Sequence, residues 1–230
     1  MNKLILNAIL AVAASSSSLF ATNIKHTGLD WTRALNIEIK ADSNVRTVGA
    51  GVGRMLIDGS NLIDTLCVNL FTGIAVNQTY AAVSIDATAY DSDGGIAAWL
   101  MQTYLPVVNA ATGLARQIDA AALQLAIWDT IHDGGDGFGS GRIQSTVHTN
   151  SSVLTLANSW RLEALDKSAN AGVYTAAPGA RTFQQQIYLP TCNGGADCGT
   201  SGDVPEPGTF AMLAVGGMGI FFGTWRRRSE

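Results

Sequence analysis

Cys67 and Gln124 are the two residues of this 230-residue chain whose side chains could react with each other. A thiol that lies against a glutamine carboxamide in a dry pocket can attack the amide carbon and expel ammonia, which leaves an internal thioester. Burial holds the reacting atoms in register and keeps water from hydrolysing the product. The same residue types also allow an inert alternative, in which Cys67 is a small buried hydrophobic residue and Gln124 is a hydrogen-bonded core amide.

Gln124 stands in an apolar stretch, AAALQLAIWDTIH, that follows Asp119. We expect a helix here, with Asp119 as its N-cap and with Gly134 and Gly135 ending it. Gln124 is the only polar residue of the stretch before Asp129, so the helix should be buried nearly all round. A buried amide without partners costs about 1–3 kcal/mol, so another group should meet this carboxamide.

The sequences around both residues resemble two motifs of bacterial surface thioester domains. LCV at residues 66–68 is similar to the family's aromatic-or-Leu, Cys, apolar motif, and QLAIW at 124–128 is similar to its Gln-x-Ala-apolar-Trp motif. In that family the glutamine is the partner of the cysteine, and a threonine often precedes it, where this chain has Leu123. The resemblance covers about residues 60–190. It implies a thioester between Cys67 and Gln124, in a pocket supported by Leu66, Val68, Ala126 and Trp128.

The resemblance implies a covalent adhesion module that acts once and is not an enzyme. Such a module acylates an amine or hydroxyl of a surface, polysaccharide or protein partner and needs no cofactor and no metal. A non-covalent structural or carbohydrate-matrix binding protein remains the alternative. A cysteine hydrolase that uses Cys67 and His132 is a third option, but no hydrolase signature surrounds Cys67.

Periodicity predicts an α+β domain, mainly an antiparallel β-sheet of sandwich or barrel type, with an inserted helical subdomain of about three helices. Strand-like alternation covers residues 33–40, 61–71, 79–90 and 181–190. Helical patterns cover residues 96–105, the stretch that follows Asp119, and residues 152–167. We expect Pro106 to end the first of these helices.

The first 21 residues have the layout of a secretory signal peptide, with one early lysine, an apolar run and a small-residue stretch before Ala21. Residues 22–190 are then the exported domain and residues 191–203 a linker. Export places the domain in an oxidising compartment, where Cys192 and Cys198 could close a small disulfide loop and Cys67 is left over.

Residues 204–230 resemble a PEP-CTERM sorting signal. An uncharged span of residues 209–225 predicts a single transmembrane helix, and the arginines after it keep their side of the membrane cytoplasmic. The resemblance implies processing by an exosortase-type protease and delivery to the cell surface or extracellular matrix. The sorting motif is Val204, Pro205, Glu206 and Pro207, and the membrane-flanking residues are Trp225, Arg226, Arg227 and Arg228.

Charge and composition limit the other partners. Residues 22–208 hold 17 acidic and 10 basic residues, a net charge of about −7, and no basic cluster, which argues against nucleic acid. Asp91 with Asp93, or Asp133 with Asp136, could offer oxygen ligands to calcium, but helix capping and turn formation explain them better. The tryptophans Trp99, Trp128 and Trp160 are expected in the core.

Overall fold

The computed structural model describes residues 21–190. The predicted signal peptide, linker, Cys192–Cys198 disulfide, sorting motif and membrane helix lie outside these residues, with the membrane-flanking Trp225 and arginines. None of the described helices is long and apolar enough to cross a membrane.

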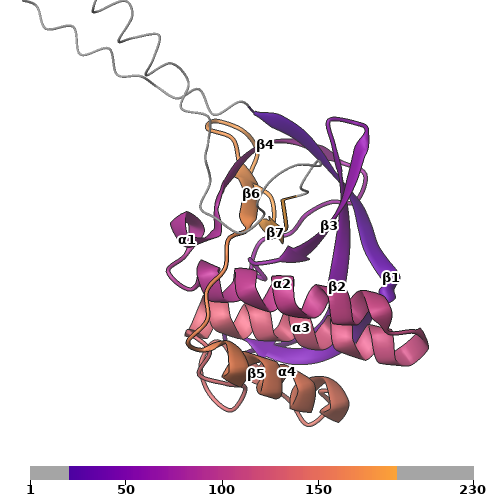
Figure 1. Cartoon of the computed structure of the whole chain (residues 1–230), viewed down its shortest axis with the longest axis vertical. Helices are drawn as coiled ribbons and strands as arrows, with labels where there is room; N and C mark the ends of the chain where they lie inside the picture. The colour runs from indigo at the N-terminus through magenta and orange to yellow at the C-terminus, as the bar shows by residue number, and fades with distance from the viewer. Residues whose placement is uncertain (1–20, 191–230) are drawn as a thin grey trace, which may run out of the picture. The chain divides into compact units, whose positions relative to one another are not determined.

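The described residues contain one antiparallel sheet of seven strands in the order β2-β3-β7-β6-β4-β1-β5. Strand β1 also pairs with β2, so six strands close into a barrel and β5 adds to the far end of β1 (Figure 1). The predicted antiparallel sheet is thereby confirmed. The strands are β1 (Thr22–Ala41), β2 (Asn44–Ile57), β3 (Asn61–Cys67), β4 (Thr79–Asp86), β5 (Ile143–Ser145), β6 (Gly172–Ala176) and β7 (Gln186–Tyr188).

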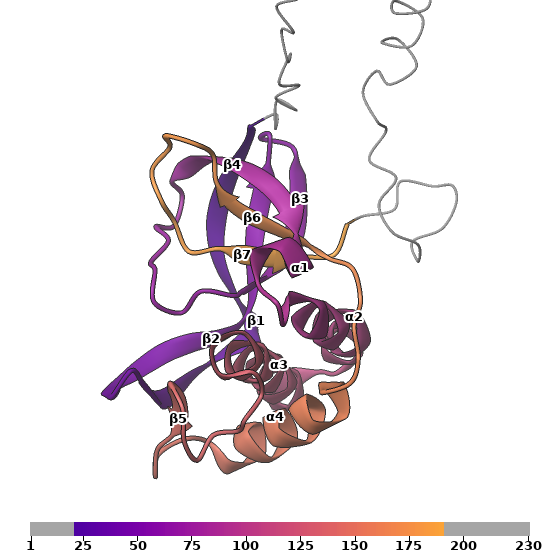
Figure 2. The same cartoon turned by 90° about the vertical axis from the view of Figure 1, so that its left-hand side faces the viewer.

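Four helices lie between β4 and β6 in the sequence and pack against one end of the barrel (Figure 1). Helix α3 contacts α2, α4 and the far halves of β1 and β2, which run beside the helices in Figure 2. This central place explains why residues 120–131 are buried without interruption. The helices are α1 (Ala87–Tyr90), α2 (Gly94–Ala110), α3 (Gly113–Asp133) and α4 (Ser151–Ala164).

Several predicted boundaries are wrong for identifiable reasons. Helix α2 runs through Pro106 to Ala110, because the buried side chains on both sides of the proline, Leu105 and Val108, outweigh one lost hydrogen bond. Helix α3 begins at Gly113, six residues before the expected cap at Asp119. The end of the predicted 79–90 strand is helical, because Asp86 caps α1 through Thr88. Of the predicted 181–190 strand, only β7 is extended and paired.

Strand β1 makes a detour where it passes from the barrel to the helices. Leu29 pairs with Gly53 and Ala34 pairs with Gly51, so residues 30–33 of β1 stand opposite a single residue of β2. We refer to residues 30–33 as the excursion. Gly51 has φ +141°, and a Cβ there would collide with the backbone of Arg33 and Ala34. The close approach of the excursion to β2 therefore requires glycine at this position.

Candidate functional site

The structure places Gln124 directly against Cys67. Cys67 is the last residue of β3, and Gln124 lies in the middle of α3, which is buried along this stretch. The backbone N–H of Cys67 donates to Gln124 Oε1 at 3.0 Å, and Gln124 Nε2 donates to the carbonyl oxygen of Cys67 at 2.7 Å. The carboxamide therefore pairs with Cys67 as a neighbouring strand would, and it has the partners that a buried amide needs.

The sulfur of Cys67 lies in an apolar setting. Burial raises the pKa of the Cys67 thiol to about 12, and weaker hydrogen-bonding contacts from the Trp128 indole and the Asn69 backbone N–H oppose the rise. The indole N–H is otherwise buried without a hydrogen-bond partner, so its contact with the sulfur is a weak one. At neutral pH the group is a neutral thiol and not the thiolate of a typical catalytic cysteine.

The contacts of the carboxamide bear on its reactivity. A hydrogen bond to Gln124 Oε1 polarises the carbonyl and stabilises negative charge that develops on this oxygen during attack at the adjacent carbon. The bond from Nε2 to the Cys67 carbonyl fixes the rotation of the amide group. The arrangement can therefore hold the carbonyl carbon of Gln124 in place beside the residue that carries the thiol.

A groove with a volume of about 800 Å³ reaches this pair. Cys67, Gln124 and Trp128 form part of its lining, together with residues of β1, of β2 and of the segment 70–76 that follows β3. Cys67 is 8% exposed and Gln124 only 1%, so the cysteine is the more accessible member of the pair. The volume falls within the range of about 300–1,000 Å³ that is usual for small-molecule sites.

The groove has few charged groups. Arg46 on β2 is the only Lys, Arg, Asp or Glu among its lining residues. Its guanidinium has no ion pair or hydrogen bond with the described part of the chain, although its charge contributes to lowering the pKa of Asp42. His26 on β1 also lines the groove; its Nδ1 is buried without a partner, and burial lowers its pKa. A neutral imidazole and one guanidinium without an ion pair therefore share the groove with Cys67 and Gln124.

Other buried polar side chains lie next to Cys67 in the sheet. Gln186 on β7 stands opposite Cys67 in the sheet, and its Oε1 accepts from the hydroxyl of Thr65 at 3.1 Å. Gln186 Nε2 donates to Gln184 Oε1 at 3.2 Å. Thr65 is fully buried and Gln186 is 2% exposed. The bond between Thr65 and Gln186 joins β3 to β7 beside Cys67.

The other residues proposed from the sequence fall in different places. Leu66, Val68 and Ala126 are fully buried core residues and are not among the lining residues of the groove. Trp128 is both buried and part of the lining. His132 is not a lining residue; its ring stacks edge-on against Phe71 with centroids 4.9 Å apart. The structure therefore brings Trp128 to Cys67 and leaves His132 outside the groove.

Two of the four acidic residues considered for calcium, Asp91 and Asp133, accept backbone hydrogen bonds, whereas the Asp93 side chain makes no cap hydrogen bond. Asp91 accepts from the backbone N–H of Asp93, and Asp133 accepts from Arg142 and Ile143 backbone N–H groups at 2.7 Å each. These are the turn-forming roles that the sequence favours. The oxygens of Asp129, Asp133 and Asp136 lie within 4.8 Å of one another, and Asp129 also faces Arg161 at 3.7 Å.

Among the lining residues of the groove that sequence reasoning missed are His26, Trp31 and Arg46. Each lies on a long strand whose alternation is interrupted, so strand periodicity does not show which face it occupies. The only signal in the sequence is the glycine series of VGAGVGR at residues 48–54, where three alternate positions lack side chains and leave room beside the strand.

The fold and the site define a small antiparallel barrel with a helical insertion and a buried Cys–Gln pair at the base of a groove. Residues 203–228 match the PEP-CTERM protein-sorting motif. This match indicates an exported protein that exosortase sorts to the cell envelope or surface. No curated protein and no solved structure matches the chain.

Proposed function

We propose that the exported chain forms an internal thioester between Cys67 and Gln124 and uses it once to attach covalently to an amine or hydroxyl of a surface or biofilm partner. The observation that carries the proposal is the double hydrogen bond between the Gln124 carboxamide and the backbone of Cys67. These bonds support the proposal because they hold the carboxamide against the residue that carries the thiol.

The proposed reactions balance without a cofactor. In the first, Cys67 Sγ bonds to the side-chain carbonyl carbon of Gln124, the carbon–nitrogen bond breaks, and the thiol proton leaves with the nitrogen as ammonia. In the second, an amine or hydroxyl of the partner bonds to the same carbon and the carbon–sulfur bond breaks. The proton of the nucleophile passes to the sulfur, whose high pKa favours the neutral thiol.

The same geometry is unfavourable for a cysteine hydrolase. Such an enzyme needs a thiolate or a base that creates one, and burial raises the pKa of Cys67 instead. His132, the candidate base in the sequence, packs against Phe71 and does not line the groove. His26 does line the groove, but no hydrogen bond joins its ring to Cys67. We therefore propose a single-use attachment module and not an enzyme that turns over.

The mass of the full-length chain tests the proposal. Chain purified in detergent and measured in denaturing acid should be lighter than its calculated mass by one ammonia. Cys67→Ala and Gln124→Glu should each have their own calculated mass, because neither variant can form the bond. Incubation with methylamine should add one methylamine to the wild-type chain alone and expose one new thiol. A wild-type chain of full calculated mass that takes up no methylamine contradicts the thioester.

A reversible binding module is the second candidate, and the groove supports it. A cavity of this size beside an inert Cys67–Gln124 pair can hold a ligand without covalent chemistry. This candidate predicts the full calculated mass together with reversible retention on matrix material. The mass measurement separates the two candidates.

A further inference from the structure

Trp31 lies on the rim of the groove and is 55% exposed. It belongs to the excursion, the short segment by which β1 departs from its pairing with β2. A tryptophan offers a large flat surface at little cost in conformational entropy, which suits it to binding the face of a ring. The question is whether the fold holds this indole in a fixed place.

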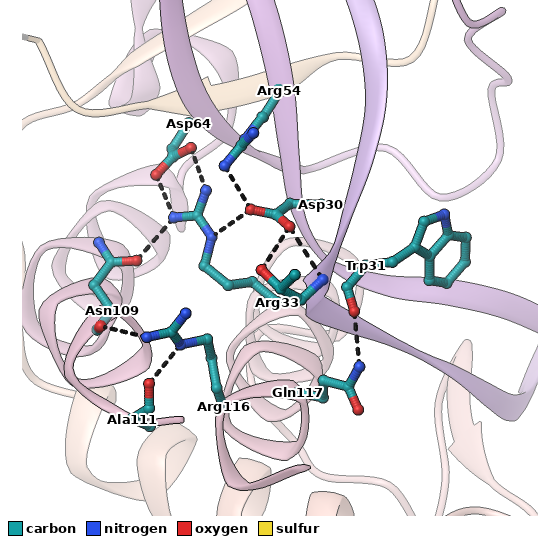
Figure 3. A network of polar contacts seen from close by, with 10 residues as sticks. Asp30, Trp31, Arg33, Arg54, Asp64, Asn109, Ala111, Arg116 and Gln117 are labelled. Atoms are coloured by element: carbon teal, nitrogen blue, oxygen red, sulfur yellow. Dashed lines mark hydrogen bonds and ion pairs between the residues drawn. The ribbon is translucent and has the colours of Figure 1, made fainter. Parts of the chain in front are cut away.

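A buried ionic network anchors the residues on both sides of Trp31 (Figure 3). The carboxylate of Asp30 accepts from Arg33 Nε at 2.9 Å and from Arg54 at 2.7 Å. The Arg33 guanidinium also pairs with Asp64 on β3 and donates to Asn109 Oδ1 of α2 at 2.8 Å. The Arg33 and Asp30 side chains are only 9% and 8% exposed. The excursion is therefore fixed to the barrel and to the helices.

Trp31 has an anchor of its own. Its carbonyl oxygen accepts from Gln117 Nε2 of α3 at 2.7 Å. Figure 3 shows the indole extending away from the network while the carbonyl faces Gln117. The fold thus holds the backbone of Trp31 from two sides and leaves its side chain free, as a binding platform requires.

The charges of the groove select among ligands. No Asp or Glu lines it, so an ammonium group would find no carboxylate partner there. Arg46 would repel an ammonium group, and its unpaired guanidinium is suited to a carboxylate. This preference is local, because the domain as a whole is acidic.

We propose that the groove binds an acidic carbohydrate chain, with a sugar ring on Trp31 and a sugar carboxylate on Arg46. This inference deepens the proposed function and rests on it for the covalent step alone. The group that attacks Gln124 is then a sugar hydroxyl. Its oxygen bonds to the carbonyl carbon, the carbon–sulfur bond breaks, and the hydroxyl proton passes to Cys67 Sγ. The product is an ester of the Gln124 side chain and a free thiol.

Reversible binding is tested in the full-length Cys67→Ala chain, which cannot form a thioester. Immobilised alginate serves as the acidic carbohydrate, dextran as the uncharged one and polylysine as the cationic polymer. We expect stronger retention on alginate than on dextran, whereas binding to polylysine should follow the negative charge of the whole domain and should not depend on Trp31 or Arg46. Trp31→Ala should weaken that retention at least about tenfold, equivalent to about 1.4 kcal/mol. Arg46→Ala should weaken it on alginate and leave the weaker binding to dextran unchanged.

Two matched variants control for the loss of surface side chains. Leu162→Ala removes a 56% exposed apolar residue on α4, and Arg181→Ala removes an exposed arginine; neither residue lines the groove. Both should bind alginate as the Cys67→Ala parent does. Equal retention of the Trp31, Arg46 and control variants on alginate would overturn the proposal, as would a loss of polylysine binding in Trp31→Ala as large as its loss of alginate binding.

The wild-type chain tests the covalent step separately. After incubation with alginate it should stay attached in denaturant and be released by alkaline hydroxylamine, which cleaves esters and leaves amides intact. If Cys67→Ala binds as expected but the wild type neither attaches covalently nor takes up methylamine, the thioester proposal fails and the carbohydrate site stands. If the wild type takes up methylamine but Cys67→Ala does not bind alginate, the carbohydrate site fails and the thioester stands.

Discussion

Two polar clusters are buried beside the groove, and they differ in charge. One is the ionic network of Asp30, Arg33 and Asp64, which ties the excursion to β3 and α2. The other is the neutral pair of Cys67 and Gln124, which ties β3 to α3. Both join the barrel to the helical insertion, but only the second is made of groups that can react with each other.

The difference shows why a reactive centre benefits from being uncharged. Removing one member of a buried ionic network strands a charge in a medium that solvates it poorly, so such a network resists chemical change. The Cys67–Gln124 pair can lose a neutral molecule of ammonia and leave no ion behind. The charged cluster is therefore suited to positioning Trp31, and the neutral cluster to chemistry.

Breaking the charged cluster should have the largest effect on stability. Arg33→Ala leaves the 30% exposed Asp64 without its partner and Asp30 paired with Arg54 alone, and we expect a loss of up to about 3–5 kcal/mol in the free energy of unfolding, measured by urea denaturation. Arg142→Ala is the matched control. Arg142 donates two hydrogen bonds to one aspartate, Asp42, but both side chains are about half exposed. It should cost no more than about 1 kcal/mol. Similar losses in the two variants would show that burial of the network is unimportant.

Opening the thioester should have the next largest effect. Residues 67 and 124 are 57 positions apart, and the chain-entropy relation for disulfide loops gives about 4 kcal/mol for closing a loop of this length. Methylamine opens the bond without any substitution, so treated wild-type chain should unfold at lower urea concentration than untreated chain. Cys67→Ala should show no response to methylamine. If treatment leaves the wild-type midpoint unchanged, the crosslink is absent or contributes nothing to stability.

The sequence predicts the long, regular elements of the fold and misplaces their ends. Alternation at residues 33–40 and the apolar stretch at 120–132 are strong local signals and lie within β1 and α3, but both elements begin earlier than expected. Pro106 was read as a helix end because its local cost is known, but the packing of α2 against α3 decides the matter. The closure of the barrel rests on pairing between β1 and β4, residues far apart in the chain, which local patterns do not encode.

The residues of the candidate site also differ in how well the sequence predicts them. Gln124 is conspicuous in the sequence because it is a lone polar residue in an apolar helix, and the structure buries it against Cys67. Trp31 and Arg46 carry no such signal, since an exposed tryptophan and a surface arginine are ordinary on a strand. Their role depends on the excursion, which arises from the fit of Gly51 against the backbone of Arg33 and Ala34.

Asp129 extends the comparison, because it is a buried carboxyl group that becomes neutral when it takes up a proton. Burial raises its pKa to about 7, and nearby Asp133 and Asp136 add to the rise while Arg161 opposes it. A carboxyl group whose pKa is higher in the folded state stabilises the fold below its unfolded pKa of about 4, and this contribution is lost as pH rises through 7. Wild-type stability relative to Asp129→Asn should thus be greater at pH 4 than at pH 8, by at most about 4 kcal/mol.

Thermal unfolding of both chains across pH 4–8 measures this difference. Comparing the two chains cancels the opposite contribution of His26 and His132, whose lowered pKa values destabilise the fold as pH falls below about 6.5. Asp166→Asn removes only an exposed pair with Lys167, which lowers the pKa of Asp166, so its difference from the wild type should stay constant between about pH 5 and pH 8. A constant difference between wild type and Asp129→Asn would show that Asp129 keeps an ordinary pKa.

Removing Gln124 from a chain that cannot form a thioester should have the smallest effect of the four. In the Cys67→Ala background, Gln124→Ala strands the backbone N–H and C=O of residue 67, and we expect a loss of about 1–3 kcal/mol in urea denaturation. Gln117→Ala is the matched control, because it removes an amide of the same helix that bonds to the exposed Trp31 carbonyl. It should cost less than about 1 kcal/mol, since water can replace that partner. Equal losses at the two positions would mean that Gln124 is no better paired than a surface glutamine, and the positional argument for its reaction with Cys67 would fail.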